Sequence, residues 1–181
     1  MIKKLWKFRK RIPFLLLYYC FFRYFPSSIT PLFGRPSKWL RYHCCRHIFE
    51  YCGINVNIER GVLFGSGFGI KIGNNSGIGI NSVVPSDIEI GNNVLMGPEC
   101  FFLYMNHNFI EKSRTIRSQG YSSRMKTKIG NDVWIGREVL VTPGRTIADG
   151  TVIAARCCYC KDCPPYSVVG GNPVNIIKKR V

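Results

Sequence analysis

Alanine is almost absent from this chain of 181 residues, occurring only at positions 148, 154 and 155. Because alanine is the strongest helix former, its scarcity argues against a mainly helical protein. Long apolar runs are also lacking: the run from Pro13 to Phe22 is too short to cross a bilayer, which needs about 20 such residues. The length fits one domain.

Acidic residues are scarce as well, with 10 against 26 basic ones, a net charge of +16. The first fifty residues hold eleven Lys or Arg and a single acid, Glu50, and residues 108–128 hold six against Glu111. Such polarised charge favours polyanionic partners, namely lipid headgroups, phosphate-rich small molecules or nucleic acid. We do not expect a nucleic-acid partner, because the chain carries no RNP, zinc-finger or helix-turn-helix signature.

The nine cysteines are odd in number and include the adjacent pairs Cys44-Cys45 and Cys157-Cys158. This pattern fits reduced thiols in the cytoplasm better than a disulfide framework. The apolar run of the N-terminal segment is not followed by a signal-peptide cleavage site.

Residues 1–25 combine basic and aromatic side chains. We interpret this segment either as a peripheral contact with anionic lipid at the inner face of a membrane or as a helix packed on its own domain. The residues concerned are Lys3, Lys4, Lys7, Arg9, Lys10 and Arg11, with Trp6, Phe8, Phe14, Tyr18, Phe21 and Phe22.

A six-residue repeat decides the fold. From Ile54 the chain divides into hexapeptides such as IGNNSG and IGNNVL; the register is lost at Asn108 and resumes at Ile129 with IGNDVW and IGREVL. Strand side chains alternate, so positions five and one should point inward and position six outward. Fifteen hexapeptides, three to a turn, predict an all-β solenoid, a parallel β-helix of about five coils.

The repeat divides the chain into three parts. We expect a basic, aromatic segment over 1–53 whose helix, with Ser37 as N-cap and Gly53 as its stop, caps the solenoid end. The β-helix should span 54–164 with an extruded loop at 108–128, and a tail should occupy 165–181.

The stretches IGNDVWIG, VTPGRTI and KDCPPYSVVGGNPVNIIKK make the pattern specific. With them the chain resembles the hexapeptide-repeat acyltransferases, and most of all the maltose, galactoside and polysaccharide O-acetyltransferases. The resemblance implies left-handed coils, although the general preference for crossovers is right-handed. It also implies a homotrimer with active sites between subunits and acetyl-CoA as co-substrate, with no metal.

His107 is the candidate catalytic base. It stands at position six of FLYMNH, just before the register breaks, where the family's catalytic histidine precedes an extruded loop. Imidazole has the pKa needed to take a proton from a hydroxyl at neutral pH. Glu99, Glu111 or a backbone carbonyl are candidates to orient it.

The remaining site residues follow from the resemblance. Trp134 should lie outward beside the active site, and Asn81 and Asn106 are candidates for acceptor binding, with Asn106 expected to point inward. The candidates for CoA binding are Trp134, Gly136, Arg137, Ala155, Cys160, Lys161, Lys178 and Lys179, and Arg180 belongs to the same basic tail. Cys160 stands where relatives carry threonine, and Arg156-Cys157 replaces Gly-Ser, so this chain departs from the family pattern there.

Three other binding motifs fit the sequence less well. A zinc site is not expected at CCYCKDC, residues 157–163, because its cysteines fall on diverging positions of the repeat. Nor is one expected at HCCRH, residues 43–47, because its two histidines at helical spacing have no further ligand nearby. The glycine-rich VLFGSGFGI fits the hexapeptide register rather than a phosphate loop. A carbonic anhydrase of this fold would need three histidines, and the repeat region has only His107.

The sequence therefore predicts an acetyl-CoA-dependent O-acetyltransferase acting on a sugar hydroxyl, in surface polysaccharide or lipid-linked oligosaccharide synthesis. An N-acetyltransferase for an amino sugar and a non-catalytic, membrane-associated β-helix scaffold are the alternatives.

Overall fold

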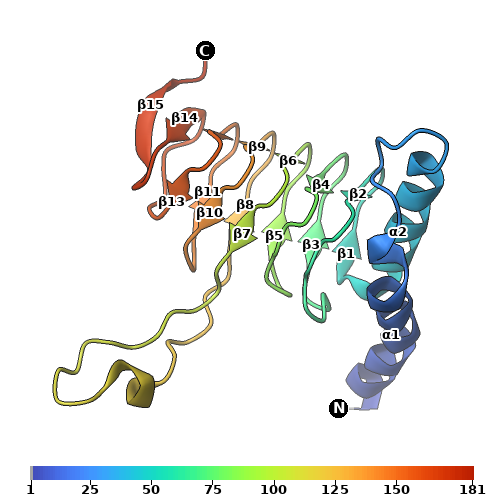
Figure 1. Cartoon of the computed structure of the whole chain (residues 1–181), viewed down its shortest axis with the longest axis horizontal. Helices are drawn as coiled ribbons and strands as arrows, with labels where there is room; N and C mark the ends of the chain where they lie inside the picture. The colour runs from blue at the N-terminus through green and yellow to red at the C-terminus, as the bar shows by residue number, and fades with distance from the viewer. Residues whose placement is uncertain (1) are drawn as a thin grey trace.

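The computed structural model describes residues 2–181, with side chains from Arg9 onward. Lys3, Lys4, Trp6, Lys7 and Phe8 of the expected membrane-contacting segment therefore have side chains outside the described residues. The chain forms a parallel β-solenoid with two helices at its N-terminal end and a long arm projecting from its side (Figure 1).

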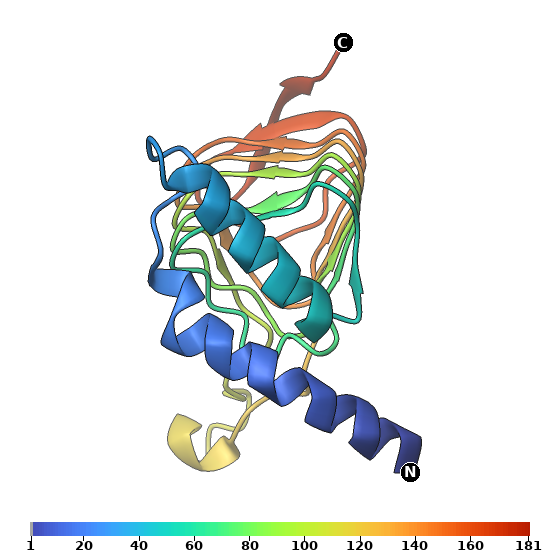
Figure 2. The ribbon, with the colours of Figure 1, turned by 90° about the vertical axis from the view of Figure 1, so that its right-hand side faces the viewer.

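Three faces of short parallel strands build the solenoid, and successive coils appear as nested triangles when viewed along the axis (Figure 2). The first face holds β1 (Tyr51–Cys52), β3 (Lys71–Ile72), β5 (Glu89–Ile90), β8 (Lys128–Ile129) and β11 (Thr146–Ile147). The second holds β2 (Asn57–Ile58), β4 (Gly77–Ile78), β6 (Leu95–Met96), β9 (Trp134–Ile135), β12 (Val152–Ile153) and β14 (Ser167–Gly170). The third holds β7 (Phe101–Phe102), β10 (Leu140–Val141) and β13 (Cys158–Tyr159), preceded by bridges at Leu63 and Val83.

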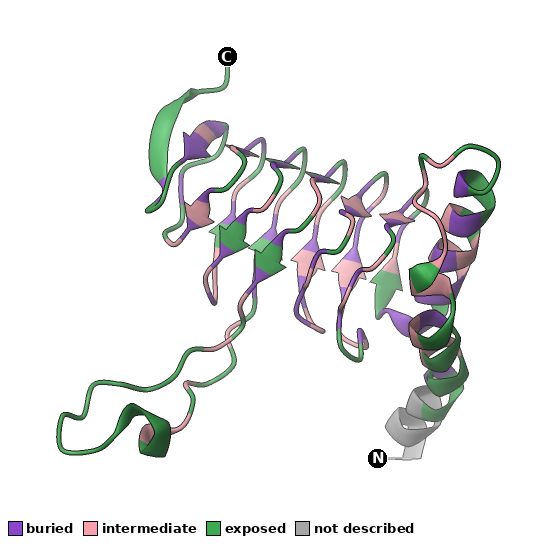
Figure 3. Cartoon of the chain, viewed as in Figure 1, coloured by how far each residue is buried: buried purple, intermediate pink, exposed green. Residues whose placement is uncertain are grey.

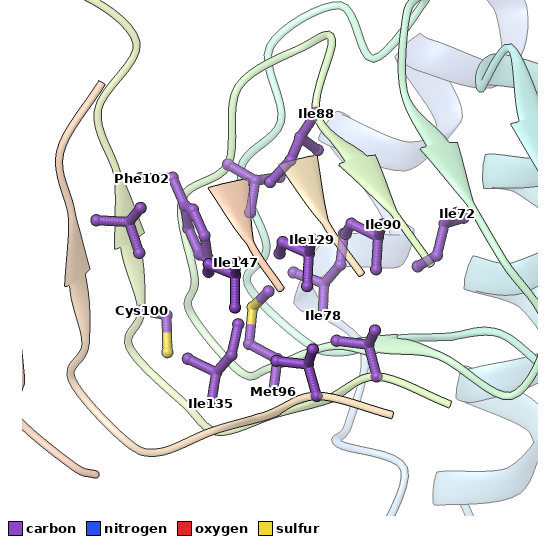
Figure 4. Packing of buried hydrophobic residues seen from close by; sticks show 14 of the residues in the cluster. Ile72, Ile78, Ile88, Ile90, Met96, Cys100, Phe102, Ile129, Ile135 and Ile147 are labelled. Atoms are coloured by element: carbon purple, nitrogen blue, oxygen red, sulfur yellow. The ribbon is translucent and has the colours of Figure 1, made fainter. Parts of the chain in front are cut away.

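The predicted inward and outward positions are confirmed from the second coil onward. Positions one and five are buried from Ile70 to Phe102 and from Ile129 to Cys163, with half-buried Arg145 as the exception. No residue at position six is buried over the same ranges. Isoleucines of the first and second faces fill the interior together with Phe102 of the third face (Figure 4), so each coil adds its share of apolar burial to one continuous core.

The first coil departs from the predicted register. Tyr51 pairs with Lys71, whereas Lys71 pairs with Glu89, so the first coil is two residues longer than the second. The extra residues lie in the glycine-rich corner at 65–69, where Gly65 and Gly67 take positive φ. With β1 before Ile54 and β14 after residue 164, the solenoid makes about six turns.

Asparagine ladders hold the corner between the first and second faces together. Asn55, Asn75 and Asn93 take positive φ, which asparagine tolerates, and the side-chain amide of each of the first two donates to the next, at 3.1 and 3.3 Å. In a parallel column the side-chain oxygens of Asn92 and Asn131 accept backbone N–H groups of the preceding coil at 2.8 and 2.9 Å. The repeated Asn-Asn of the sequence is thus a stacking device.

Two helices cap the N-terminal end. In α1 (Ile2–Cys20) the Tyr19 hydroxyl bridges Gly65 O and Phe64 N at 2.9 and 3.1 Å, so the glycine-rich corner is a docking point for this helix. A 3-10 turn, η1 (Phe22–Tyr24), leads to α2 (Gly34–Ile48). No helix within residues 2–181 has the length and apolar character needed to cross a membrane.

The predicted bounds of the capping helix are wrong at both ends. Helix α2 begins at Gly34, three residues before Ser37, whose hydroxyl is buried inside the helix and donates to Phe33 O at 2.7 Å. It ends at Ile48 because Phe49 turns to an extended conformation and enters the first coil, so Gly53 lies beyond it.

A buried ion pair fastens α2 to the solenoid. Arg41 is fully buried, and its guanidinium donates to Ile58 O at 2.6 Å and Pro26 O at 2.9 Å. It lies 3.6 Å from the carboxylate of Glu59. Burial alone would raise the pKa of Glu59, but hydrogen bonds from Ser28 and Asn57 outweigh it and lower the pKa, so Glu59 is ionised at neutral pH.

The C-terminal end closes differently. After β14 the chain reverses, and β15 (Asn175–Lys179) pairs with it antiparallel, Val168 lying opposite Lys178. This exposed strand adds to the edge of the second face (Figure 3).

We expect Arg41→Ala to destabilise the fold by about 3–5 kcal/mol, because it leaves the carboxylate of Glu59 buried without its cation. Urea unfolding at pH 7 measures the loss. The matched variant Arg35→Ala, which removes an exposed arginine of the same helix, should change stability by less than about 1 kcal/mol. Equal effects of the two variants would contradict the role of the buried pair.

Candidate active site

The arm leaves the solenoid earlier than predicted. Leu103 makes the last ladder bond, its N–H donating to Val141 O at 2.9 Å, and the chain rejoins the first face at Lys128, which already belongs to β8. The predicted loop 108–128 is therefore displaced at both ends. The arm is largely exposed (Figure 3) and carries a short 3-10 helix, η2 (Ile116–Gln119), near its tip.

His107 lies exposed near the base of this arm, as predicted. It pairs with Tyr121 in an isolated antiparallel bridge, and the two rings lie 4.1 Å apart at 33°. The side-chain amide of Asn108 donates to Gln119 O and Tyr121 O, both at 3.1 Å. The returning segment of the arm thus contacts the imidazole through Tyr121, while His107 stays exposed to solvent.

Neither carboxylate considered as an orienting group contacts His107 within the described chain. Glu99 accepts from Arg137 at 2.8 Å, and Glu111 accepts from Arg114 at 3.2 Å near the arm tip. The expectation that Asn106 points inward is wrong: Asn106 is exposed, because the β-helix register has already ended at Leu103.

A clamp that sequence reasoning did not predict fixes the base of the arm. The Arg124 guanidinium donates to both oxygens of Asp87 at 2.9 and 2.8 Å and lies over the Tyr104 ring, 4.5 Å from its centre. Its hydrogen bonds lower the pKa of Asp87, so this carboxylate stays ionised through the neutral range. The partners are far apart in sequence and lie outside any motif.

Trp134 projects from the second face and is 54% exposed. It lines a groove of about 300 Å³ together with Leu95, Val152 and Arg180 of the C-terminal tail. The guanidinium of Arg180 already pairs with Asp132, at 2.8 Å. Lys178 and Lys179, on neighbouring β15, are exposed. The fold thus brings the predicted tryptophan and the basic tail together.

Gly136 and Ala155 stack at the corner between the second and third faces. A side chain at Gly136 would meet the backbone N of Ala155 at 2.5 Å, so only glycine permits the coils to approach there. Arg137, next along the corner, pairs with Glu99 at 2.8 Å and Glu138 at 3.2 Å. Asn81 lies at the same corner, two coils before Glu138, and like Glu138 it has a positive φ, of 55°.

Cys160 and Lys161 lie at a different corner, between the third and first faces, where β13 ends. The arm leaves the solenoid from this same edge after β7. Burial raises the pKa of the adjacent Cys157 thiol to about 11, so it packs as a neutral side chain. All nine cysteines are free thiols.

The two histidines of the HCCRH stretch point to different neighbours. His43 packs against Trp39 and Tyr42, with ring centres 4.3 and 5.2 Å away, and His47 stacks on Phe14 at 4.2 Å. Both rings act as packing groups of the cap.

The predicted site residues therefore form two groups on one chain. His107, Cys160 and Lys161 follow the edge between the third and first faces. Trp134, Gly136, Arg137, Ala155 and Asn81 lie on the second face or its corner with the third, with Lys178 and Lys179 at its end. Both groups can serve one reaction if two copies of the chain face each other.

Curated proteins similar to this chain are acetyltransferases. The galactoside O-acetyltransferase of Escherichia coli is 34% identical over 136 residues, which are 74% of this chain and 66% of that protein. A chloramphenicol acetyltransferase of Agrobacterium fabrum is 51% identical over 63 residues, 35% of this chain and 30% of that protein. The chain thus spans less than two thirds of the length of these relatives. No family model matches it.

Solved structures match over more of the chain. A galactoside acetyltransferase in complex with coenzyme A is 31% identical, with a TM-score of 0.76 over 94% of this chain and 80% of that one. A hexapeptide-repeat acetyltransferase from Vibrio cholerae is 30% identical, with a TM-score of 0.71 over 78% of this chain and 80% of that one. This chain belongs to the hexapeptide-repeat acetyltransferases, and its fold is their left-handed parallel β-helix.

We expect Arg124→Ala to loosen the base of the arm without unfolding the solenoid. The amide of Met125, bonded to Tyr104 O at 2.8 Å, and that of Ser122, bonded to Asn106 O at 2.8 Å, should exchange hydrogen about tenfold faster at pH 7. Arg114→Ala, which removes an ion pair near the arm tip, is the control. Unchanged exchange of both amides in Arg124→Ala would exclude the clamp.

Proposed function

We propose that this chain is an acetyl-CoA-dependent O-acetyltransferase that acts on a sugar hydroxyl. The observation that carries the proposal is the exposed imidazole of His107, held by Tyr121 at the base of an arm. The kinship to galactoside and maltose O-acetyltransferases supports the reaction class and the sugar acceptor.

The chemistry needs one base. His107 would take the proton of the acceptor hydroxyl as its oxygen attacks the thioester carbonyl of acetyl-CoA. The new ester C–O bond forms as the C–S bond breaks, and the proton passes from the imidazolium to the departing CoA thiolate. The cycle returns His107 to its neutral form and requires neither a metal nor a covalent enzyme intermediate.

The second face has features that fit CoA. The Trp134 groove has a volume of about 300 Å³, the Gly136–Ala155 corner has little side-chain bulk, and Lys178 and Lys179 offer cations for phosphates. Arg137 is less suited, because two carboxylates already engage its guanidinium. Cys160 and Lys161 would contact CoA only from another subunit.

A homotrimer would complete the site. His107 and Trp134 project from different faces of one chain, so a neighbour's second face would have to meet the arm edge. The third face supports such contacts, because its outward positions carry the exposed apolar residues Phe101 and Leu140. Asn81 and Asn106 remain candidates to contact the acceptor near this junction.

The proposal extends to the acceptor of the enzyme and to its place in the cell. We infer a cytoplasmic enzyme that modifies surface polysaccharide or lipid-linked oligosaccharide precursors, with its basic N-terminal region at the inner face of the membrane. A panel of galactosides, maltose, oligosaccharides, amino sugars and chloramphenicol, followed by release of free CoA thiol, tests the acceptor class. Exclusive acetylation of amines would favour an N-acetyltransferase, and no transfer to any acceptor would favour a scaffold.

His107→Ala should lower turnover by about two to four orders of magnitude, the usual loss when a general base is removed. The fold and assembly should persist, because the side chain is exposed and adds nothing to the core. Steady-state release of CoA, with circular dichroism and sedimentation velocity as controls, measures both. Near-normal turnover by a folded variant would remove His107 from the mechanism.

Replacing Lys178 and Lys179 with Glu should raise the KM for acetyl-CoA about tenfold or more and leave the KM for the acceptor nearly unchanged. The reason is charge repulsion of the donor phosphates at β15. Varying each substrate in turn separates the two constants, so the acceptor KM is the internal control. An unchanged donor KM would assign these lysines to solubility.

A further inference from the structure

Helix α1 is apolar on both of its faces, and only one of them is covered. Phe14, Leu15 and Tyr18 pack on the solenoid end and α2; the Tyr18 hydroxyl donates to Val62 O at 3.0 Å. An amphipathic helix on a soluble domain would turn polar side chains outward. Here the outward face carries Ile12, Leu16 and Leu17, followed directly by Phe21.

The exposure of this face is substantial. Leu16 is 58%, Leu17 41% and Phe21 57% exposed. Ile12 and Leu16 lie one helical turn apart, as do Leu17 and Phe21, and exposed apolar side chains grouped in this way mark an interaction surface. We name Ile12, Leu16 and Leu17 of α1, together with the adjoining Phe21, the outer α1 face.

The positive charge around the outer α1 face indicates which kind of partner it binds. Arg9 and Lys10 are exposed at the N-terminal part of the helix, and the only acidic residue in positions 1–50 is Glu50. A second copy of the same cap would bring two strongly positive surfaces together, which opposes pairing. A nucleic acid would contact the basic residues but leave the leucines and Phe21 in water.

We propose that the outer α1 face docks on an anionic lipid bilayer, with Leu16, Leu17 and Phe21 entering the interface and Arg9 and Lys10 facing the headgroups. A basic helix with an apolar side lies in the plane of such an interface. The inference rests on the proposed function only for its purpose, which is to hold the enzyme where lipid-linked acceptors are made.

The assembly would strengthen this contact. Helices α1 and α2 lie over one end of the solenoid (Figure 2). In a trimer of side-by-side solenoids with parallel axes, the three caps would therefore lie at the same end of the assembly. Three weak contacts to one bilayer then act together, and the second and third form at high effective concentration.

Vesicle sedimentation tests the proposal with the full chain. Wild-type protein should bind vesicles of phosphatidylcholine mixed with phosphatidylglycerol, bind pure phosphatidylcholine weakly, and dissociate as salt rises. Leu16→Ser combined with Leu17→Ser should lower the partition coefficient about tenfold or more. Arg9→Gln combined with Lys10→Gln should lower it about tenfold and reduce the salt dependence. Ile54→Ser, which changes a still more exposed apolar residue on the first coil, should leave the partition coefficient unchanged.

Three outcomes would overturn the inference. If the leucine variant and the wild type partition equally into vesicles, the face makes no lipid contact. If the leucine variant loses its assembly in sedimentation velocity, the face is a subunit contact. If wild type and leucine variant are both retained tightly on heparin or RNA, the partner is a polyanion.

Acetyl transfer to a soluble sugar separates this inference from the proposed function. An active enzyme that ignores anionic vesicles overturns the membrane contact alone. Vesicle binding by a chain that transfers no acetyl group overturns the proposed function alone.

Discussion

Each coil of this protein must stack directly on the one before it, and the corners set the conditions. A corner needs a residue with positive φ and no bulk toward the next coil, which glycine and asparagine supply. Asn55, Asn75 and Asn93 add a hydrogen-bonded ladder along one edge, and Gly136 allows close approach along another. Because these contacts fix the coils, chemical variety is left to the outward positions, to other corner residues such as Arg137 and Lys161, to the arm and to the two ends.

The outward positions give the three faces different characters. Lys71, Glu89 and Lys128 make the first face charged, and they form ion pairs with one another across coils. The other two faces expose Leu95, Trp134, Phe101 and Leu140 instead. The proposed homotrimer would bury the two partly apolar faces, and it would bring the candidate groups of different edges into one active site.

The repeat made much of this structure predictable, and its end marks where prediction fails. Inward and outward positions follow from a local period of six, so the exposure of Trp134 was foreseeable, whereas His107 lies past Leu103 and is exposed because it belongs to the arm. Asn106 was misplaced because the period was extended four residues past Leu103. The Arg124–Asp87 clamp and the Arg41–Glu59 pair join segments with no shared period, so only the folded chain reveals them. Ser37 resembled an N-cap by residue type, but the helix begins at Gly34 and its N-cap position is held by Phe33, which makes no side-chain capping bond.

The two ends show how closure and function are combined. A solenoid end exposes unpaired backbone and must be covered. At the C-terminal end the cover is β15, and the ion pair of Arg180 with Asp132 holds this strand beside Trp134, which places two lysines next to the candidate donor groove. At the N-terminal end the buried guanidinium of Arg41 secures α2, and α2 in turn supports α1. A cap needs only one apolar face to close the core, so the second apolar face of α1 reflects a requirement other than folding.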